Sequence, residues 1–269
     1  MLVIPTLECF ARILKRIFDD VLKGEGMRLT KQEIETFHND GFLLLRGFAD
    51  PSLCDDILSL ASKHLYEMVE PIESEEEYLQ TKKGTKTTRR LRQVYDRDPL
   101  FKSWMTNVEM RPILEQLLGE PPVLLLAHHN SIMTKLPQVS SVTTWHQDIR
   151  YWHFENDKLL SVWLSLGDEY LDNGLLEFIP GTHKMEFRTE QFDEKSGFRT
   201  DLAENQEIIK NRVHFNLKKG DVVLFHAKTL HYAGKNRSDT PKISFVYSLR
   251  AKSNNPLKNT RSDFKEVVL

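Results

Sequence analysis

Two residues in the middle of the chain, His146 and Asp148, have the types and spacing to bind a metal ion. In an extended strand, side chains two positions apart point to the same face, so this imidazole and carboxylate would lie side by side. A third ligand from a distant strand would complete a 2-His-1-carboxylate triad, which leaves coordination positions open on iron(II). The pair alone is weak evidence for a metal site, because a chain with 10 His and 39 acidic residues can contain His-x-Asp by chance.

The chain has ten histidines, and the nine besides His146 compete for the position of third ligand. His128 and His129 are adjacent at the end of a predicted strand, so at most one of them can face a pocket. His226 and His231 both lie in the segment 220–231, where a turn and a strand lead into a short loop. We interpret His226, on or just past the strand, as a supporting or structural histidine.

Composition excludes several classes of protein. The chain has 269 residues and a net charge of −2, which gives no argument for nucleic acid or a membrane as the main partner. Its two cysteines, Cys9 and Cys54, form no Cys-x-x-Cys motif, so a disulfide framework and a zinc finger are both disfavoured. This cysteine usage fits a reducing setting, and we expect a cytoplasmic protein. No apolar run approaches the roughly 20 residues that a transmembrane helix needs.

The first 26 residues differ from the rest. Apolar residues recur there at helical spacing, and Gly24 to Gly26 end the stretch. This segment could be a packing helix, a membrane-surface helix, or sequence upstream of a true start at Met27. We favour a peripheral N-terminal helical extension or a start-site artefact over a membrane role. Residues 27–269 are expected to form one domain.

The next hundred residues are predicted to contain three helices and one buried strand. Thr30 and Glu33 have the spacing of a capping box, and Asp50-Pro51 would begin a second helix after a buried strand near residues 42–48. A third helix is expected near residues 110–118. Between them, an acidic stretch is followed by a basic one at residues 82–92. We interpret the basic stretch as a solvated loop, with a substrate-entry loop for an anionic group as the alternative.

From Val123 onward, short apolar runs alternate with turn signals, as in an all-β barrel or jelly roll. The expected fold is therefore mainly β with flanking helices. Residues 185–212 are polar without alternation, and we expect an insertion with some helix. The predicted strands are Val123–Ala127, Ser131–Lys135, Thr144–Arg150, Leu159–Leu166, Leu175–Ile179, His214–Leu217, Asp221–Phe225 and Ile243–Leu249.

Four blocks in this order resemble the phytanoyl-CoA dioxygenase family of iron(II)- and 2-oxoglutarate-dependent oxygenases. They are Asp40-Gly41-Phe42, His146-Gln147-Asp148, the segment 173–183 that ends in Pro-Gly-Thr-His, and the segment 220–231. Each block alone is unremarkable, but their order and spacing both match. The similarity covers roughly residues 27–249.

The resemblance implies a double-stranded β-helix, a cupin-like jelly roll, with iron(II) bound by His146, Asp148 and His231. Geometry alone would also admit manganese or zinc. The open positions would take 2-oxoglutarate and O2, and turnover would yield succinate and CO2. Related halogenases lack the carboxylate, so Asp148 favours hydroxylation. The expected substrate is a small molecule of unknown identity.

The family usually places an arginine eleven residues after the distal histidine, where it binds the far carboxylate of 2-oxoglutarate. Here that position is Lys242, with Ser244 on the same strand face, and lysine lacks the two-pronged guanidinium. The resemblance thus implies co-substrate binding by Lys242, Ser244 and Trp163. Alternatively, Lys242 is an ordinary strand lysine, and Arg250 or an arginine of the basic stretch supplies the charge.

Two further groups are open to interpretation. Tyr151, Trp152 and Phe154 follow the His-x-Asp pair and could wall the substrate pocket or belong to the core. Thr182 and His183 could contact the site or be structural. Two rival functions remain: a cupin-type metal enzyme that does not use 2-oxoglutarate, and a non-catalytic metal-binding sensor or binding module.

Overall fold

The computed structural model describes residues 27–79 and 87–269, and the N-terminal extension expected at residues 1–26 lies outside them. The described helices are α2 (Lys31–Asp40), α3 (Pro51–Tyr66), α4 (Glu75–Leu79), α5 (Pro99–Met105), α6 (Met110–Leu118) and α7 (Ala203–Ile209). The strands are β1 (Phe42–Leu45), β2 (Ile72–Ser74), β3 (Thr88–Arg92), β4 (Pro122–Lys135), β5 (Thr143–His146), β6 (Leu159–Ser165), β7 (Leu176–Phe178), β8 (Val213–His214), β9 (Val222–His226), β10 (His231–Ala233), β11 (Lys242–Ala251) and β12 (Glu266–Val268).

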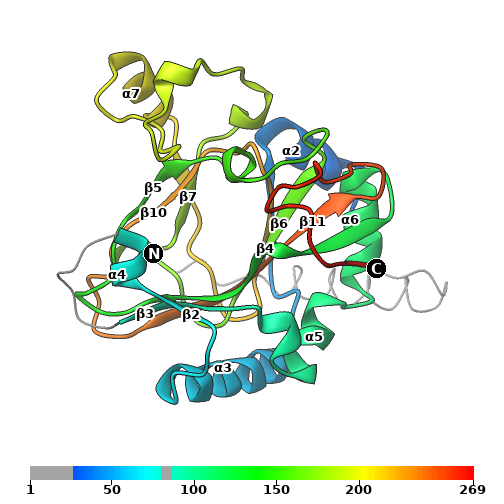
Figure 1. Ribbon diagram of the computed structural model, residues 1–269, viewed down its shortest axis with the longest axis vertical. Helices are drawn as coiled ribbons and strands as arrows, with labels where there is room; N and C mark the ends of the chain where they lie inside the picture. Colours follow the sequence, from blue (N-terminus) through cyan, green and yellow to red (C-terminus); the bar gives the residue numbers. More distant parts are fainter. Residues whose placement is uncertain (1–26, 80–86) are drawn as a thin grey trace.

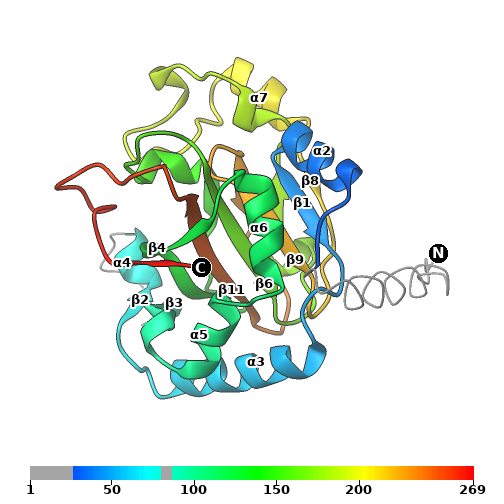
Figure 2. The ribbon, with the colours of Figure 1, turned by 90° about the vertical axis from the view of Figure 1, so that its right-hand side faces the viewer.

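These strands form two antiparallel sheets. The major sheet has the order β1-β9-β6-β11-β4-β3-β2, with β12 paired to β4, and the minor sheet has the order β5-β10-β7-β8. The two sheets face each other, and α3, α5 and α6 cover the outer face of the major sheet (Figures 1 and 2). The predicted mainly-β jelly roll with flanking helices is therefore confirmed.

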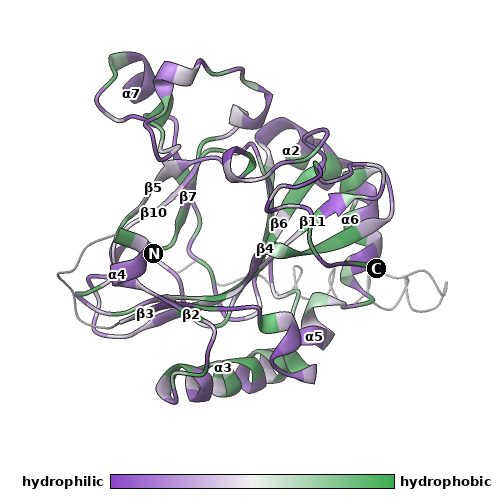
Figure 3. Cartoon of the chain, viewed as in Figure 1, coloured by the Kyte–Doolittle hydropathy of each residue, from purple (hydrophilic) through white to green (hydrophobic). Residues whose placement is uncertain are grey.

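Alternation along the strands separates two hydrophobic layers. On β9, Val222 and Leu224 pack with the helices in the largest core cluster, whereas Val223 and Phe225 pack between the sheets. Strands β4 and β6 are accordingly mostly hydrophobic, while many connecting loops are hydrophilic (Figure 3). Trp163 on β6 lies in the layer between the sheets, where the candidate site is found.

Local signals correctly predicted several boundaries. Thr30 and Glu33 form the reciprocal capping box at the start of α2, and Asp50 caps α3. Helix α6 ends at Gly119, which adopts a left-handed conformation with φ 71°.

Other boundaries differ from the prediction. The strand expected at residues 144–150 ends at His146, and Asp148 begins a 3-10 turn, η2 (Asp148–Tyr151). The two strands expected within residues 123–135 form the single strand β4. The strand expected at residues 214–217 is limited to Val213–His214. The basic stretch is not simply a solvated loop, because Arg89 on β3 is buried.

Candidate metal centre

Three side chains from three segments converge between the sheets. His146 ends β5, Asp148 begins η2, and His231 begins β10, where it is the register partner of His146. Asp148 Oδ1 lies 3.7 Å from His146 Nε2 and 3.8 Å from His231 Nε2. One ligand atom from each residue lies within 4.8 Å of the others. The structure thus gathers the three predicted ligands, and their role as ligands stays a prediction.

Backbone contacts join the two segments that carry these residues. The Ile149 amide in η2 donates to the Ala227 carbonyl at 3.0 Å, and the Gln147 side-chain amide donates to the Lys228 carbonyl. Both acceptors lie in the turn between β9 and β10. The position of Asp148 is therefore tied to the chain that leads into His231.

The two imidazoles are oriented by neighbouring carbonyls. His146 Nδ1 donates to Thr144 O at 2.8 Å, and His231 Nδ1 donates to Thr229 O at 3.0 Å. Because a carbonyl only accepts, the hydrogen of each neutral ring lies on Nδ1, and Nε2 keeps its lone pair. Burial, with the charge of His231, lowers the pKa of His146 to about 3, and burial also lowers the pKa of His231. Both rings are thus neutral and able to coordinate a metal.

The Asp148 carboxylate is buried and surrounded by imidazoles. Burial raises its pKa, but His129, His231 and His146 together hold that pKa below its usual range. Its ion-pair contacts within 4 Å among the described residues are all with histidines. A buried carboxylate without a cationic partner is costly, and a divalent metal between these three side chains would supply the missing charge. The donor set therefore fits the metal that the sequence predicts.

His129 is a neighbour of this site that the sequence did not single out. Its Nε2 lies 3.1 Å from Asp148 Oδ1, and Ser161 Oγ donates to Oδ2 at 3.3 Å. His129 is directed there by an irregularity in β4, where residues 126–129 have no register partner on β11. His128 faces away and bonds Ser262, so one histidine of the pair faces the pocket, as expected.

A cavity between the sheets begins at these histidines. Besides His146, His231 and His129, its lining includes three cationic residues, Arg89, Lys135 and Lys242, which we call the cationic cluster. The rest of the lining is mainly apolar. Lys135 Nζ donates to the carbonyl of Ala233, which lies two positions after His231 on β10, roughly 7 Å along an extended strand, so the triad and the cationic cluster lie at different ends of a short cavity.

The three residues predicted to bind 2-oxoglutarate meet at a buried carboxylate, Glu169. Lys242 Nζ lies 3.2 Å from Glu169 Oε2. Ser244 Oγ and Trp163 Nε1 donate to Oε1 at 2.7 and 3.0 Å. The Glu169 side chain is 0% exposed. Lys242 is therefore already paired, which the sequence did not predict, and its role in co-substrate binding remains a prediction.

The other candidate pocket residues lie at different places relative to the triad. The Arg250 guanidinium pairs with Glu266, away from the cavity lining described above. Tyr151 is 41% exposed and its ring centroid lies 6.1 Å from that of His146, so it borders the triad. Trp152 and Phe154 pack around the His128 ring, and Trp152 also contacts the ring of His129.

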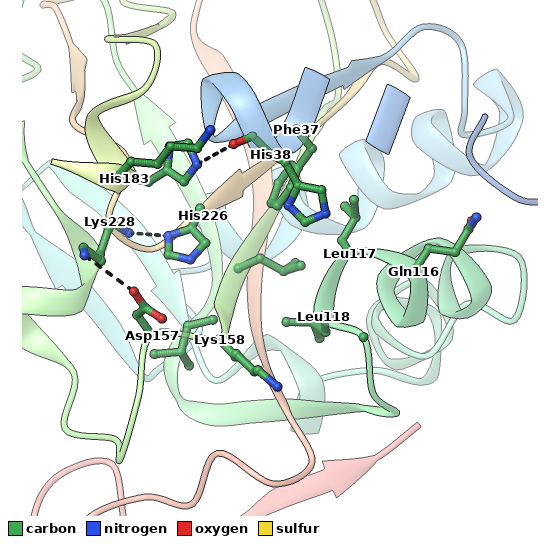
Figure 4. Close-up of a pocket in the computed structure, with 14 residues that line it drawn as sticks. Phe37, His38, Gln116, Leu117, Leu118, Asp157, Lys158, His183, His226 and Lys228 are labelled. Atoms are coloured by element: carbon green, nitrogen blue, oxygen red, sulfur yellow. Dashed lines mark hydrogen bonds and ion pairs between the residues drawn. The ribbon is translucent and has the colours of Figure 1, made fainter. Parts of the chain in front are cut away.

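The Pro-Gly-Thr-His loop does not reach the triad. Thr182 Oγ1 donates to Ile179 O and accepts from the Leu230 amide, a structural role. His183 and His226 line a separate pocket beside α2 and α6 (Figure 4). His226 Nδ1 accepts a hydrogen bond from the Lys228 amide at 3.1 Å, in agreement with its interpretation as a structural histidine.

Comparison with known proteins agrees with this fold. The probable phytanoyl-CoA dioxygenase of Caenorhabditis elegans is 23% identical over 235 residues, 80% of this chain and 73% of its own length. The epimerase SnoN in complex with Fe3+, alpha ketoglutarate and nogalamycin RO superposes with a TM-score of 0.70 at 20% identity, over 88% of this chain and 94% of SnoN. EctD from S. alaskensis with 2-oxoglutarate and 5-hydroxyectoine gives 0.69 at 18% identity, over 85% and 78%.

The family model "Phytanoyl-CoA dioxygenase (PhyH)" matches residues 37–244, which include His146, Asp148 and His231. The match spans most of the chain and both sheets. The chain therefore belongs to the phytanoyl-CoA dioxygenase family.

Proposed function

We propose that this protein is an iron(II)- and 2-oxoglutarate-dependent dioxygenase that hydroxylates a small-molecule substrate. The observation that carries the proposal is the convergence of His146, Asp148 and His231, with both Nε2 atoms free to coordinate. Membership of the phytanoyl-CoA dioxygenase family supports the choice of iron and 2-oxoglutarate, the groups named in the solved relatives SnoN and EctD.

Different residues would bind the metal and the co-substrate. His146, Asp148 and His231 would hold the metal on one face and leave the remaining positions for co-substrate and O2. When bound, iron(II) and 2-oxoglutarate supply the oxidation of a C–H bond, with one oxygen atom of O2 entering the product and the other entering succinate as CO2 leaves. The far carboxylate of 2-oxoglutarate would lie deeper in the cavity, away from the metal, and apolar walls such as Phe225 and Val246 would exclude water.

The substrate would approach beside Tyr151. Its exposed ring contacts the ring of His146. A substrate there would meet the metal from the solvent side, while the co-substrate occupies the cavity between the sheets.

The direct test is succinate formation from 2-oxoglutarate by the purified protein with iron(II), in the presence of candidate small molecules. Zinc(II) is the matched control, because it binds the same ligand types but has no redox chemistry. We expect succinate with iron and none with zinc, and a product that has gained one oxygen atom. A product with an inverted centre and no added oxygen would contradict hydroxylation while retaining the oxygenase chemistry.

The same assay separates the two rivals. Product formation without 2-oxoglutarate would favour a cupin-type metal enzyme. Metal binding without succinate for any substrate would favour a sensor or binding module. Failure to bind a metal at all would contradict all three readings.

Partners and location remain proposals. Within residues 27–79 and 87–269, no helix has both the length and the hydrophobicity that a bilayer span requires. We propose a cytoplasmic location, which fluorescence microscopy of the tagged full-length chain would test.

A further inference from the structure

Lys242 occupies the position expected to bind the co-substrate, but its positive charge is already paired with a carboxylate of the chain. Its ammonium lies 3.2 Å from Glu169 Oε2, and both side chains are almost completely buried. Ser244 and Trp163 donate to the other oxygen, so Glu169 fills the place where an external carboxylate would sit. A second carboxylate at Lys242 would either share one ammonium or displace Glu169 from three donors.

Lys135 and Lys242 are register partners on β4 and β11, but the groups that their ammonium nitrogens contact are different. Its Nζ donates to two uncharged acceptors, Ser141 O at 2.7 Å and Ala233 O at 3.1 Å. An ammonium has three donors, so one remains. Among the described residues, no carboxylate oxygen lies within the 4 Å ion-pair distance of Lys135, whereas Lys242 and Arg89 both have such a partner.

Arg89 adjoins Lys135 through Ser141. The Ser141 hydroxyl accepts from Arg89 Nη1 at 2.8 Å and donates to Glu75 Oε2, while its carbonyl accepts from Lys135. Glu75 also lies 3.6 Å from the Arg89 guanidinium. Of the three basic residues that line the cavity, Lys135 is thus the one without a carboxylate partner among the described residues.

We propose that Lys135 binds the far carboxylate of 2-oxoglutarate, and that Glu169 holds Lys242 as a fixed ion pair in the wall. This assignment rests on the proposed function. It places the anionic end of the co-substrate at the basic residue without a carboxylate partner among the described residues, and it leaves the buried Lys242–Glu169 pair intact. Arg89 then positions Lys135 through Ser141.

A change in protonation accompanies this assignment. The charged groups that face Lys135 are Lys242 on β11, Arg89 on β3 and Glu75 in α4. Burial, with Lys242 and Arg89, lowers the pKa of Lys135 to about 6, so the amine is mostly neutral at pH 7.5. A bound carboxylate stabilises the ammonium, so binding should take up a proton.

Calorimetric titration of the iron(II)-loaded protein under anaerobic conditions tests the assignment. The ligands are 2-oxoglutarate and 2-oxobutyrate, which shares the metal-binding end but lacks the far carboxylate. We expect Lys135→Met to weaken 2-oxoglutarate binding about 10- to 100-fold, the cost of one charged hydrogen bond. Binding of 2-oxobutyrate should change by less than about threefold, because the metal end is unaltered. Two buffers of different ionisation enthalpy should show proton uptake in the wild type and none in the variant.

The matched control replaces both members of the Lys242–Glu169 ion pair in the cavity wall, which we call the wall pair. Lys242→Met alone would leave Glu169 buried and unpaired, so the double variant Glu169→Gln/Lys242→Met is used, with its melting temperature as a folding check. We expect 2-oxoglutarate binding within about threefold of the wild type. A large loss in the double variant with full binding in Lys135→Met would overturn the assignment. An equal loss of both ligands in Lys135→Met would also overturn it. Failure of the wild type to bind 2-oxoglutarate would instead contradict the proposed function.

Discussion

The two ends of the cavity are opposite in charge and differ in how that charge is balanced. At the triad, one buried carboxylate, Asp148, faces three imidazoles and has no cationic partner among the described residues. At the cationic cluster, Lys242 and Arg89 are paired with Glu169 and Glu75, and Lys135 is left over. One end therefore lacks a cation, and the other has a basic side chain, Lys135, that can bind an anion.

This difference shows what the cavity is built to receive. A divalent metal would complete the first end, and a carboxylate at the far side of the cavity would complete the second. A 2-oxo dicarboxylic acid that chelates the metal carries that second carboxylate on the same molecule. Substitutions at the two ends should therefore have different consequences, for function at the triad and for folding at the wall pair.

The largest effect is expected from Asp148→Asn. The change removes the one anionic ligand, so iron(II) affinity should fall by more than about 100-fold, beyond what the loss of a supporting contact costs. Succinate formation should fall below detection. Competition titration with a metal-binding dye measures the affinity, and His214→Gln, at an exposed histidine, is the matched control. Unchanged iron affinity in Asp148→Asn would contradict the assignment of Asp148 as a metal ligand.

The wall pair should matter for folding. Glu169→Gln leaves Lys242 buried without a counter-charge and should lower the free energy of unfolding by about 3–5 kcal/mol. The double variant Glu169→Gln/Lys242→Met should recover most of that loss, because a neutral pair needs no charge balance. Urea denaturation measures both values. If the single variant is as stable as the wild type, Glu169 is not the partner that holds Lys242.

Acid should destabilise the folded protein through two partly buried histidines that lie outside the triad. Burial lowers the pKa of His128 to about 3 and of His226 to about 4, below the unfolded value near 6.5. As the pH falls below 6.5, the unfolded chain binds protons that the folded chain excludes, so the free energy of unfolding decreases. At pH 5 each residue should cost about 1–2 kcal/mol relative to pH 7.5. Denaturation of His128→Leu at both pH values should show a smaller drop, and an identical drop would contradict the role of His128.

The smallest effect is expected from His129→Leu. Loss of the 3.1 Å contact to Asp148 Oδ1 should lower iron(II) affinity about tenfold, as is typical for a residue that supports a ligand. His128→Leu, one position earlier and facing away, should leave the affinity unaltered. Equal affinities in the two variants would show that the irregularity in β4 does not contribute to the triad.

Much of the fold could be predicted because its signals are local. The capping box of Thr30 and Glu33 and the glycine after α6 determine helix ends within a few residues. Alternation on the strands indicated the two hydrophobic layers. Likewise, the order of the motif blocks pointed to His146, Asp148 and His231, which the structure then brings together.

The remaining features depend on contacts between distant segments. The direction of His129 follows from register between β4 and β11, which no local pattern reveals. Glu169 and Lys242 are 73 positions apart, so no local pattern indicates that the two side chains pair. Arg89 lies in a basic stretch that reads as solvent-exposed, yet its guanidinium is buried against Tyr78 and Glu75. For Lys242 and Arg89, the sequence shows that the side chain is basic, but the acidic residue that pairs with it cannot be identified without the fold.

The most direct test of the central claim is a crystal structure of the protein grown anaerobically with iron(II) and 2-oxoglutarate. We predict one metal ion bound by His146 Nε2, His231 Nε2 and an Asp148 oxygen. The co-substrate should chelate it, with its far carboxylate on Lys135 and the Lys242–Glu169 pair intact. A metal bound elsewhere, or these three side chains without metal at saturating iron, would contradict the claim.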